Sequence, residues 1–262
     1  MKHILLLIVF ILYGSSSFAN GGLLIEYGGD ALTEKECRQI ERMMDYQMEF
    51  YRMFGLKDSL KVRLTVFDER SEGVFYLDTI GISKYHPLKN VNALYMHNRK
   101  EAVILGMDKD RKRMLPVIYH ELSHYFTREV TGVNPPIWFM EGLSEYFEHC
   151  EVGKKGIRHS MTAYEKGRIR TMYMLGEINL RKFVDADRTL FMKKQRTDEQ
   201  YAYILAHALT TFMLENVSRQ FFSDFITLLQ DKTDRAKVSD KIARVYPGGF
   251  EAFETDFEKF CE

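Results

Sequence analysis

Apolar residues recur with two different periods along this chain. Over residues 32–54 they follow a helical period, with Thr33 able to cap the start of the helix and Gly55 placed to end it. Residues 61–67 alternate apolar and polar side chains, which predicts a strand with one buried face. Short apolar segments between turn residues predict three further strands, at residues 75–77, 93–97 and 102–107.

After residue 108 the helical period returns. Pro116 suits the first turn of a helix that runs to residue 129, and residues 138–149 follow as a second helix after a loop. Two glycines with two lysines between them predict a surface loop at residues 153–156. Later apolar segments predict helices at residues 160–175, 198–217, 219–232 and 251–260.

This order of elements predicts an α+β fold, because the strands are grouped and most helices follow them. We expect a small, mainly antiparallel sheet lobe with one helix over residues 20–110, followed by a helical lobe over residues 111–262. A chain of 262 residues is long enough for a single domain built from these two lobes.

The N-terminus has the pattern of a secretory signal peptide. Lys2 precedes an apolar run at residues 4–13, and small side chains at Ser17 and Ala19 fit cleavage after Ala19. The run is about half of the roughly 20 residues that span a bilayer. We therefore expect residues 1–19 to be removed and the remainder to be exported, to the periplasm or the exterior, without stable membrane insertion. An uncleaved membrane anchor is the alternative.

Charge and cysteine content narrow the possible partners and covalent links. The chain has 37 basic and 37 acidic residues, so no net field attracts nucleic acid, and we expect no nucleic-acid partner. An oxidising compartment permits a disulfide among Cys37, Cys150 and Cys261, of which Cys37 and Cys261 could join the two ends of the chain. Three free thiols are the equal alternative. The sequence carries no indication of the oligomeric state.

The segment His120-Glu121-Leu122-Ser123-His124 carries the candidate chemistry. Two histidines four positions apart lie on one face of a helix, so both rings can reach one metal ion. Glu121 is displaced around the helix and can reach a water molecule without binding the metal. Ile118, Leu122 and Tyr125 form an apolar stripe on the same segment, which supports a helix there.

A catalytic zinc ion needs a third protein ligand and one open position. Sixteen residues separate His124 from Glu141, enough for a helix end, a loop and a return helix, and Glu141 is the predicted third ligand. Glu145 lies one turn further on the same face and suits a carboxylate that accepts the second ring N–H of a zinc-bound histidine. The alternative is a solvated acidic face, but Phe139 and Leu143 interleave with these acids and indicate a packed helix.

The motif at residues 120–124, together with Trp138-Phe139-Met140-Glu141-Gly142-Leu143-Ser144-Glu145-Tyr146, resembles the gluzincin metallopeptidases. That group includes thermolysin-like and aminopeptidase N-like enzymes, and bacterial gluzincin-like domains of unassigned substrate carry a similar "EGLAEY" helix. The resemblance is strong over residues 115–148. Met140 and a slightly shorter interval before Glu141 depart from the larger groups and indicate a separate subfamily.

The resemblance implies a zincin-like metallopeptidase fold with one Zn²⁺ per chain, bound by His120, His124 and Glu141. It implies that Glu121 is the general base. It also implies that Glu145 accepts a hydrogen bond from a zinc-bound histidine without binding the zinc itself. It also implies that the last strand before the motif helix, at residues 102–107, borders the cleft and pairs with an extended substrate.

Peptide hydrolysis also creates an oxyanion, which a tyrosine or histidine usually stabilises beside the metal. The segment 200–215 offers Tyr201, Tyr203 and His207, and the resemblance points most to Tyr201. Packing is the alternative role for each of the three. Four other histidines lack ligand spacing, and we expect no role for them: His86, His97, His149 and His159.

The sequence thus predicts an exported, zinc-dependent peptidase that acts on a peptide or protein, with Glu121 accepting a proton from the attacking water. A zinc-bearing binding or assembly factor of the cell envelope, with little or no turnover, is the alternative from another class. Esterase or amidase action on a non-peptide would use the same residues. The intact Glu121 favours catalysis, because a purely structural zinc site needs no base.

Overall fold

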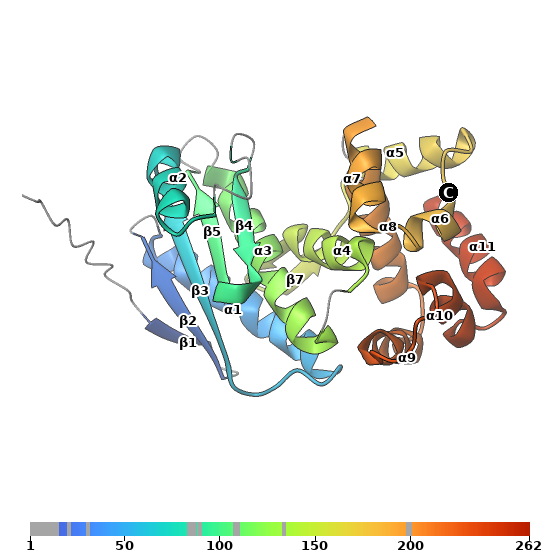
Figure 1. Cartoon of the computed structure of the whole chain (residues 1–262), viewed down its shortest axis with the longest axis horizontal. Helices are drawn as coiled ribbons and strands as arrows, with labels where there is room; N and C mark the ends of the chain where they lie inside the picture. Colours follow the sequence, from blue (N-terminus) through green and yellow to red (C-terminus); the bar gives the residue numbers. More distant parts are fainter. Residues whose placement is uncertain are drawn as a thin grey trace, which may run out of the picture.

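The computed structural model describes residues 16–19, 22–29, 32–82, 88, 91–106, 111–132, 135–197 and 201–262. Over these residues the chain is α+β, with a small mixed sheet, a hairpin and eleven α-helices. The sheet lies on one side of the molecule and most of the later helices on the other (Figure 1). Two helices lie between them, α3 (Arg111–Thr131) and α4 (Ile137–Glu148).

The larger sheet has five strands in the order β1-β2-β3-β5-β4. Its centre is parallel and consists of β2 (Leu23–Gly28), β3 (Leu60–Phe67) and β5 (Glu101–Leu105). β1 (Ser16–Ala19) and β4 (Ala93–Met96) pair antiparallel at its two ends. The strands predicted near residues 61–67, 93–97 and 102–107 are confirmed to within two residues.

The prediction of a mainly antiparallel sheet is wrong, because helices connect the central strands. α1 (Glu34–Arg52) connects β2 to β3, and α2 (Arg70–Thr79) follows β3. Each helix carries the chain back along the sheet, so the next central strand can run parallel to the one before it. The strand expected at residues 75–77 lies inside α2. Gly73 and Leu77 are the buried positions of this helix, and their spacing of four is helical.

α1 confirms the helix predicted over residues 32–54. The Thr33 hydroxyl accepts the N–H of Glu36, and the Glu36 carboxylate accepts the N–H of Thr33, which completes a capping box. The same carboxylate accepts two hydrogen bonds from Arg111, at 3.0 and 2.7 Å. The start of α1 is therefore joined to the start of α3.

The helical part differs from its prediction mainly in detail. Pro116 lies inside α3 rather than in its first turn, because the helix begins five residues earlier. The loop expected at residues 153–156 is the turn of a β-hairpin, β6 (Cys150–Gly153) and β7 (Gly156–His159). The later helices are α5 (Ala163–Met174), α6 (Leu180–Val184), α7 (Arg188–Thr197), α8 (Tyr201–Glu215), α9 (Arg219–Gln230), α10 (Val238–Val245) and α11 (Gly249–Cys261). Of these, α6, α7 and α10 were not predicted.

Gly142 determines how closely α4 packs on α8. A β-carbon at this position would lie 2.5 Å from the carbonyl oxygen of Ala206 and would also meet the hydroxyl of Thr210. Backbone cannot yield as a flexible side chain can, so the absence of a side chain permits this approach. On the same helix the indole of Trp138 is fully buried and donates to the carbonyl of Val184, at 2.9 Å.

Only part of the predicted signal peptide falls within the described residues. Residues 1–15 lie outside them, and residues 16–19 form β1. No helix in the described part of the chain is both long and apolar enough to cross a bilayer. The three cysteines, Cys37, Cys150 and Cys261, are free thiols, which is the second of the two alternatives considered for them.

Candidate metal and active site

α3 and α4 bring the three predicted ligands together at one point. Nε2 of His120 lies 3.5 Å, and Nε2 of His124 3.7 Å, from the same oxygen, Oε2 of Glu141. Ligands at zinc bond lengths of about 2.0–2.1 Å stand about 3.3 Å apart in a tetrahedral site. The three atoms therefore enclose a space of the size that one ion needs. We call His120, His124 and Glu141 the first group.

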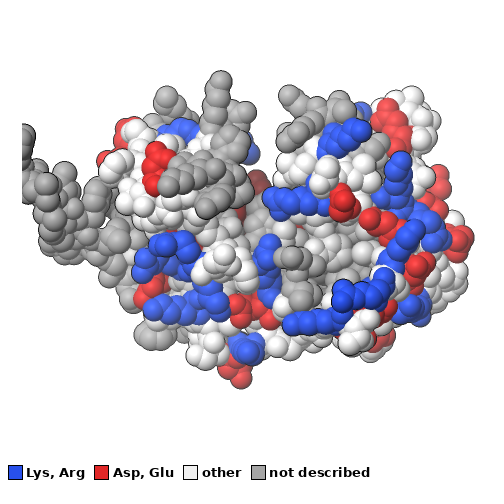
Figure 2. Space-filling model, in the orientation of Figure 1, with Lys and Arg blue, Asp and Glu red and all other residues white. Residues whose placement is uncertain are grey.

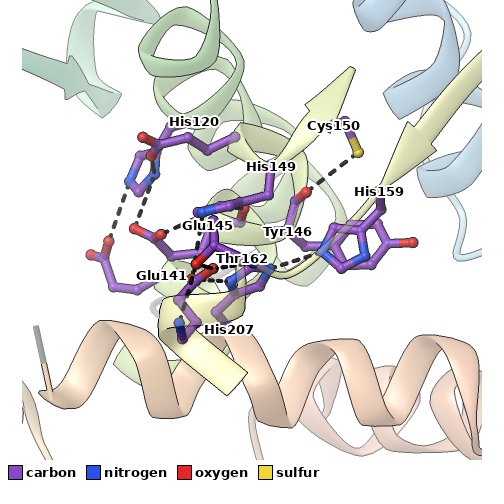
Figure 3. A network of polar contacts seen from close by, with 11 residues as sticks. His120, Glu141, Glu145, Tyr146, His149, Cys150, His159, Thr162 and His207 are labelled. Atoms are coloured by element: carbon purple, nitrogen blue, oxygen red, sulfur yellow. Dashed lines mark hydrogen bonds and ion pairs between the residues drawn. The ribbon is translucent and has the colours of Figure 1, made fainter. Parts of the chain in front are cut away.

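Hydrogen bonds on the outer side hold both imidazole rings in this orientation. Nδ1 of His120 lies 2.8 Å from Oε2 of Glu148, and Nδ1 of His124 lies 3.1 Å from the hydroxyl of Ser144. With Nδ1 engaged, Nε2 of each ring is available to a metal. Glu145 was the predicted carboxylate for this support. Its Oε1 lies 3.6 Å from Nδ1 of His120 (Figure 3), so Glu148, at 2.8 Å, makes the closer contact.

The protonation states of Glu141 and His124 suit metal binding. Burial opposes charge on Glu141, but His124 and His120 stabilise the carboxylate and keep its pKa below the ordinary value. Burial lowers the pKa of His124 to about 4. Glu141 is therefore ionised and His124 neutral at pH 7, which are the forms in which these side chains bind metals. Burial lowers the pKa of His120, but hydrogen bonds to Glu141 and Glu148 raise it well above its ordinary value, so His120 must release a proton when it binds a metal.

The side chain of Glu121 extends from α3 toward the sheet. It is 9% exposed, and burial raises the pKa of its carboxyl group to about 7. A backbone hydrogen bond from Tyr95 holds it against β4. β4 is thus the strand beside the first group, and it is the last strand of its sheet. Residues 102–107 were expected in this place, but β5 lies between β3 and β4, where both of its edges are already paired.

A notch on the molecular surface lies above these helices. Figure 2 shows it between the sheet side and the helical side, and in the same orientation α4 crosses beneath it (Figure 1). The ring atoms below are not sealed off, since the side chains of His120 and His124 each keep 12% of their surface exposed. The first group therefore keeps some contact with solvent.

The two candidate tyrosines of α8 lie on different faces of the helix. The hydroxyl of Tyr201 donates to the carbonyl of Glu177, at 3.2 Å. Burial raises the pKa of Tyr203, and Glu141 and Glu145 raise it further, so the phenol of Tyr203 lies near those carboxylates. Two positions on a helix differ by about 200°, which explains the separation. Of the two, Tyr203 is the one whose pKa Glu141 and Glu145 raise, whereas the hydroxyl of the predicted Tyr201 is engaged by the carbonyl of Glu177.

A second cluster of histidines and carboxylates adjoins the first and was not predicted. Glu145, His149, Glu165 and His207 each offer one ligand atom, and these atoms lie within 4.8 Å of one another. We call these four residues the second group. His207, a candidate oxyanion donor, belongs to it, and His159 contacts His207 at 2.8 Å. The spacing of four between Glu145 and His149 was the available signal in the sequence.

His97 belongs to neither group and is exposed in a short 3₁₀ turn (His97–Arg99). His86 lies outside the described residues.

Comparison with known proteins assigns no family to this chain. No family model matches it, and no curated protein is significantly similar to it. The donor atoms themselves indicate the chemistry. Two imidazole nitrogens and one carboxylate oxygen form a ligand set of catalytic zinc sites, in which a fourth position serves water or substrate. The first group fits a zinc ion in number, type and spacing of its ligands.

Proposed function

We propose that this protein is a zinc-dependent peptidase of the gluzincin type, with a zincin-like fold. One observation carries the proposal: two histidine Nε2 atoms face a single oxygen of Glu141, and the buried Glu121 occupies the neighbouring position on the same helix. A structural zinc site has no use for that adjacent carboxylate, whereas hydrolysis requires a base beside the metal.

The chain's own residues divide the reaction between them. A zinc ion bound by His120, His124 and Glu141 would supply Lewis-acid polarisation of a water molecule and of the substrate carbonyl. Glu121 accepts the proton of the attacking water and returns it to the leaving amine. A pKa near neutrality suits both transfers, because the carboxyl group then neither binds the proton too tightly nor releases it too readily.

Two further features support a peptide as the substrate. Tyr203 remains protonated at neutral pH, because its pKa is raised, and its phenol can donate to the oxyanion that forms at the attacked carbonyl. β4 ends its sheet and offers backbone groups to an extended chain, as in recognition by strand addition. The pattern of residues 1–19 supports export, so we propose a peptide or protein substrate in the periplasm or outside the cell.

The test compares the digestion of a peptide library by the wild type and by Glu121→Gln, with zinc measured in both proteins. We expect about 10²–10⁴-fold slower cleavage by the variant, because the base is lost while every metal ligand is kept. Zinc content should not change. Glu72→Gln, an exposed position on α2, serves as the matched control and should cleave at the wild-type rate.

The same experiment distinguishes the alternative function. If wild type and Glu121→Gln leave the library equally undigested while both hold zinc, the protein is a zinc-bearing binding or assembly factor and the peptidase proposal is lost. Cleavage of ester or amide model substrates, without cleavage of peptides, would assign the first group to a different hydrolase.

A further inference from the structure

The second group has four ligand atoms close together, and Figure 3 labels three of its members, Glu145, His149 and His207. The four ligand atoms come from α4 and its C-terminal cap, from α5 and from α8. Nε2 of His149 lies 3.4 Å from Oε1 of Glu165, and Nδ1 of His207 lies 2.7 Å from the same oxygen. Zinc ligands stand about 3.3 Å apart. The first separation fits already, and the second would lengthen by a few tenths of an ångström.

Each ligand is also supported from its outer side. Nδ1 of His149 donates to the carbonyl oxygen of Glu145, at 2.9 Å, and its Nε2 faces Oε1 of Glu165. Oε2 of Glu165 accepts the N–H and the hydroxyl of Thr162, both at 2.7 Å, which leaves Oε1 for the interior. Outer hydrogen bonds of this kind fix the tautomer and direction of metal ligands in proteins.

Hydrogen counting gives an independent reason for an ion. Three contacts connect Glu165, His207, His159 and Glu215 in that order, at 2.7, 2.8 and 2.7 Å. Each contact needs one hydrogen, whereas two neutral imidazoles carry only two. An ion at Nδ1 of His207 takes the place of the third hydrogen. His207 can then donate from Nε2 to His159, and His159 from Nδ1 to Glu215, without an imidazolium at either His207 or His159, whose side chains are 0% and 4% exposed.

We infer that Glu145, His149, Glu165 and His207 bind a second divalent metal ion, which the two imidazole and two carboxylate ligands identify as zinc. Four protein ligands leave no position for a substrate, so this ion is structural and holds α4, α5 and α8 together. The inference stands apart from the proposed function, because no ligand of the first group belongs to it.

The test counts zinc bound per chain. The protein is purified without a histidine tag, stripped with a chelator, titrated with Zn²⁺ and analysed by mass spectrometry for metal. We expect two equivalents for the wild type and one each for His149→Gln and His124→Gln. The double variant should bind none. His97→Gln, at an exposed histidine outside both groups, is the matched control and should bind two.

A further variant covers the case in which His149→Gln does not fold. His159→Gln keeps all four ligands and removes the outer partner of His207, so the second equivalent should bind about 10–100-fold more weakly. A wild type that binds a single equivalent, lost in His124→Gln and kept in His149→Gln, overturns the inference, as does a second equivalent that His149→Gln and His159→Gln leave unchanged. A wild type that loses its one equivalent only in His149→Gln would overturn the proposed function instead and leave the second group as the metal site.

Discussion

The two histidine–carboxylate groups both depend on α4, yet they differ in what surrounds the place for an ion. The first group takes three ligands from two helices and has Glu121 and the end strand β4 beside it. The second group takes four ligands from three helical segments and has only supporting hydrogen bonds around it. If both proposals hold, similar side chains form a reactive zinc site in one place and a closed one in the other.

The two groups have the same types of ligand, histidine and glutamate. The number of ligands and the presence of an adjacent base therefore decide the role that each group can have. An ion with three protein ligands can accept water or substrate, whereas one with four is saturated. Variants that affect one group and spare the other test this distinction.

The largest effect in this comparison is expected at Tyr203. Tyr203→Phe removes a hydrogen-bond donor from the first group and should lower kcat about 10²–10³-fold, because the oxyanion loses its stabilising partner. Zinc content should stay unchanged. Tyr201→Phe is the matched control on the same helix, and peptide cleavage should fall by no more than a few-fold. Equal losses in the two variants would remove Tyr203 from the mechanism.

Glu148→Gln should separate the two groups by metal affinity. The carboxylate orients His120 from 2.8 Å, so its loss should weaken zinc binding at the first group about 10–100-fold. Competition with a chromogenic chelator measures this, and the equivalent bound by the second group should be unaffected. Unchanged affinity at the first group would transfer the orienting role to Glu145, as the sequence had predicted.

Gly142→Ala should disturb the second group more than the first. The added methyl group meets the carbonyl of Ala206 and forces α4 from α8, at a cost of about 1–3 kcal/mol in unfolding free energy. The second group spans these two helices, whereas the first spans α3 and α4. Gly167→Ala, an exposed helical glycine with open space around it, is the control and should not destabilise. Thermal unfolding and zinc titration of both variants are the measurements.

The smallest effect is expected away from both groups, at the pair formed by Glu36 and Arg111. Burial opposes ionisation of Glu36, but hydrogen bonds from Arg111 and Thr33 lower its pKa below 4.5. This carboxylate therefore stabilises the fold above pH 4.5, and the contribution disappears as the pH falls through the lowered pKa. Glu36→Gln should cost about 1 kcal/mol at pH 7, and less at pH 3.

Two controls test whether the effect of Glu36→Gln on stability is specific to its ion pair and independent of bound metal. Glu34→Gln removes a carboxylate from an exposed pair and should change stability little. A chelator should leave the difference between wild type and Glu36→Gln unaltered, because arginine rather than a metal is the partner. A difference that is equal at pH 3 and pH 7 would show that the Glu36 charge does not contribute.

The first group could be predicted because its information is local. His120 and His124 need only a helix to share a face, and Glu141 needs only a return helix after a loop of suitable length. Ser144 could not be assigned to His124, since their contact depends on the angle between α3 and α4. The choice between Tyr201 and Tyr203 depends on the rotation of α8, which the sequence does not specify.

The sheet and the second group depend on long-range arrangement. The alternation at residues 61–67 is compatible with parallel or antiparallel neighbours, although the continuous burial of β5 is typical of a central parallel strand. Glu165 follows His149 by 16 positions with a hairpin between them, and His207 lies 42 positions beyond Glu165. The packing of α8 on α4, and of α5 on α8, brings the three side chains together.

Glu145 has a consequence for how the protein would acquire its ions. Its Oε1 faces His120 and its Oε2 faces His149, at 3.6 and 3.9 Å, so one side chain contacts both groups. If both groups bind zinc as proposed, occupancy of one would change the affinity of the other, and thermodynamic linkage makes the factor equal in both directions. Two cations near one shared carboxylate also repel each other, so the two groups would not take up zinc independently.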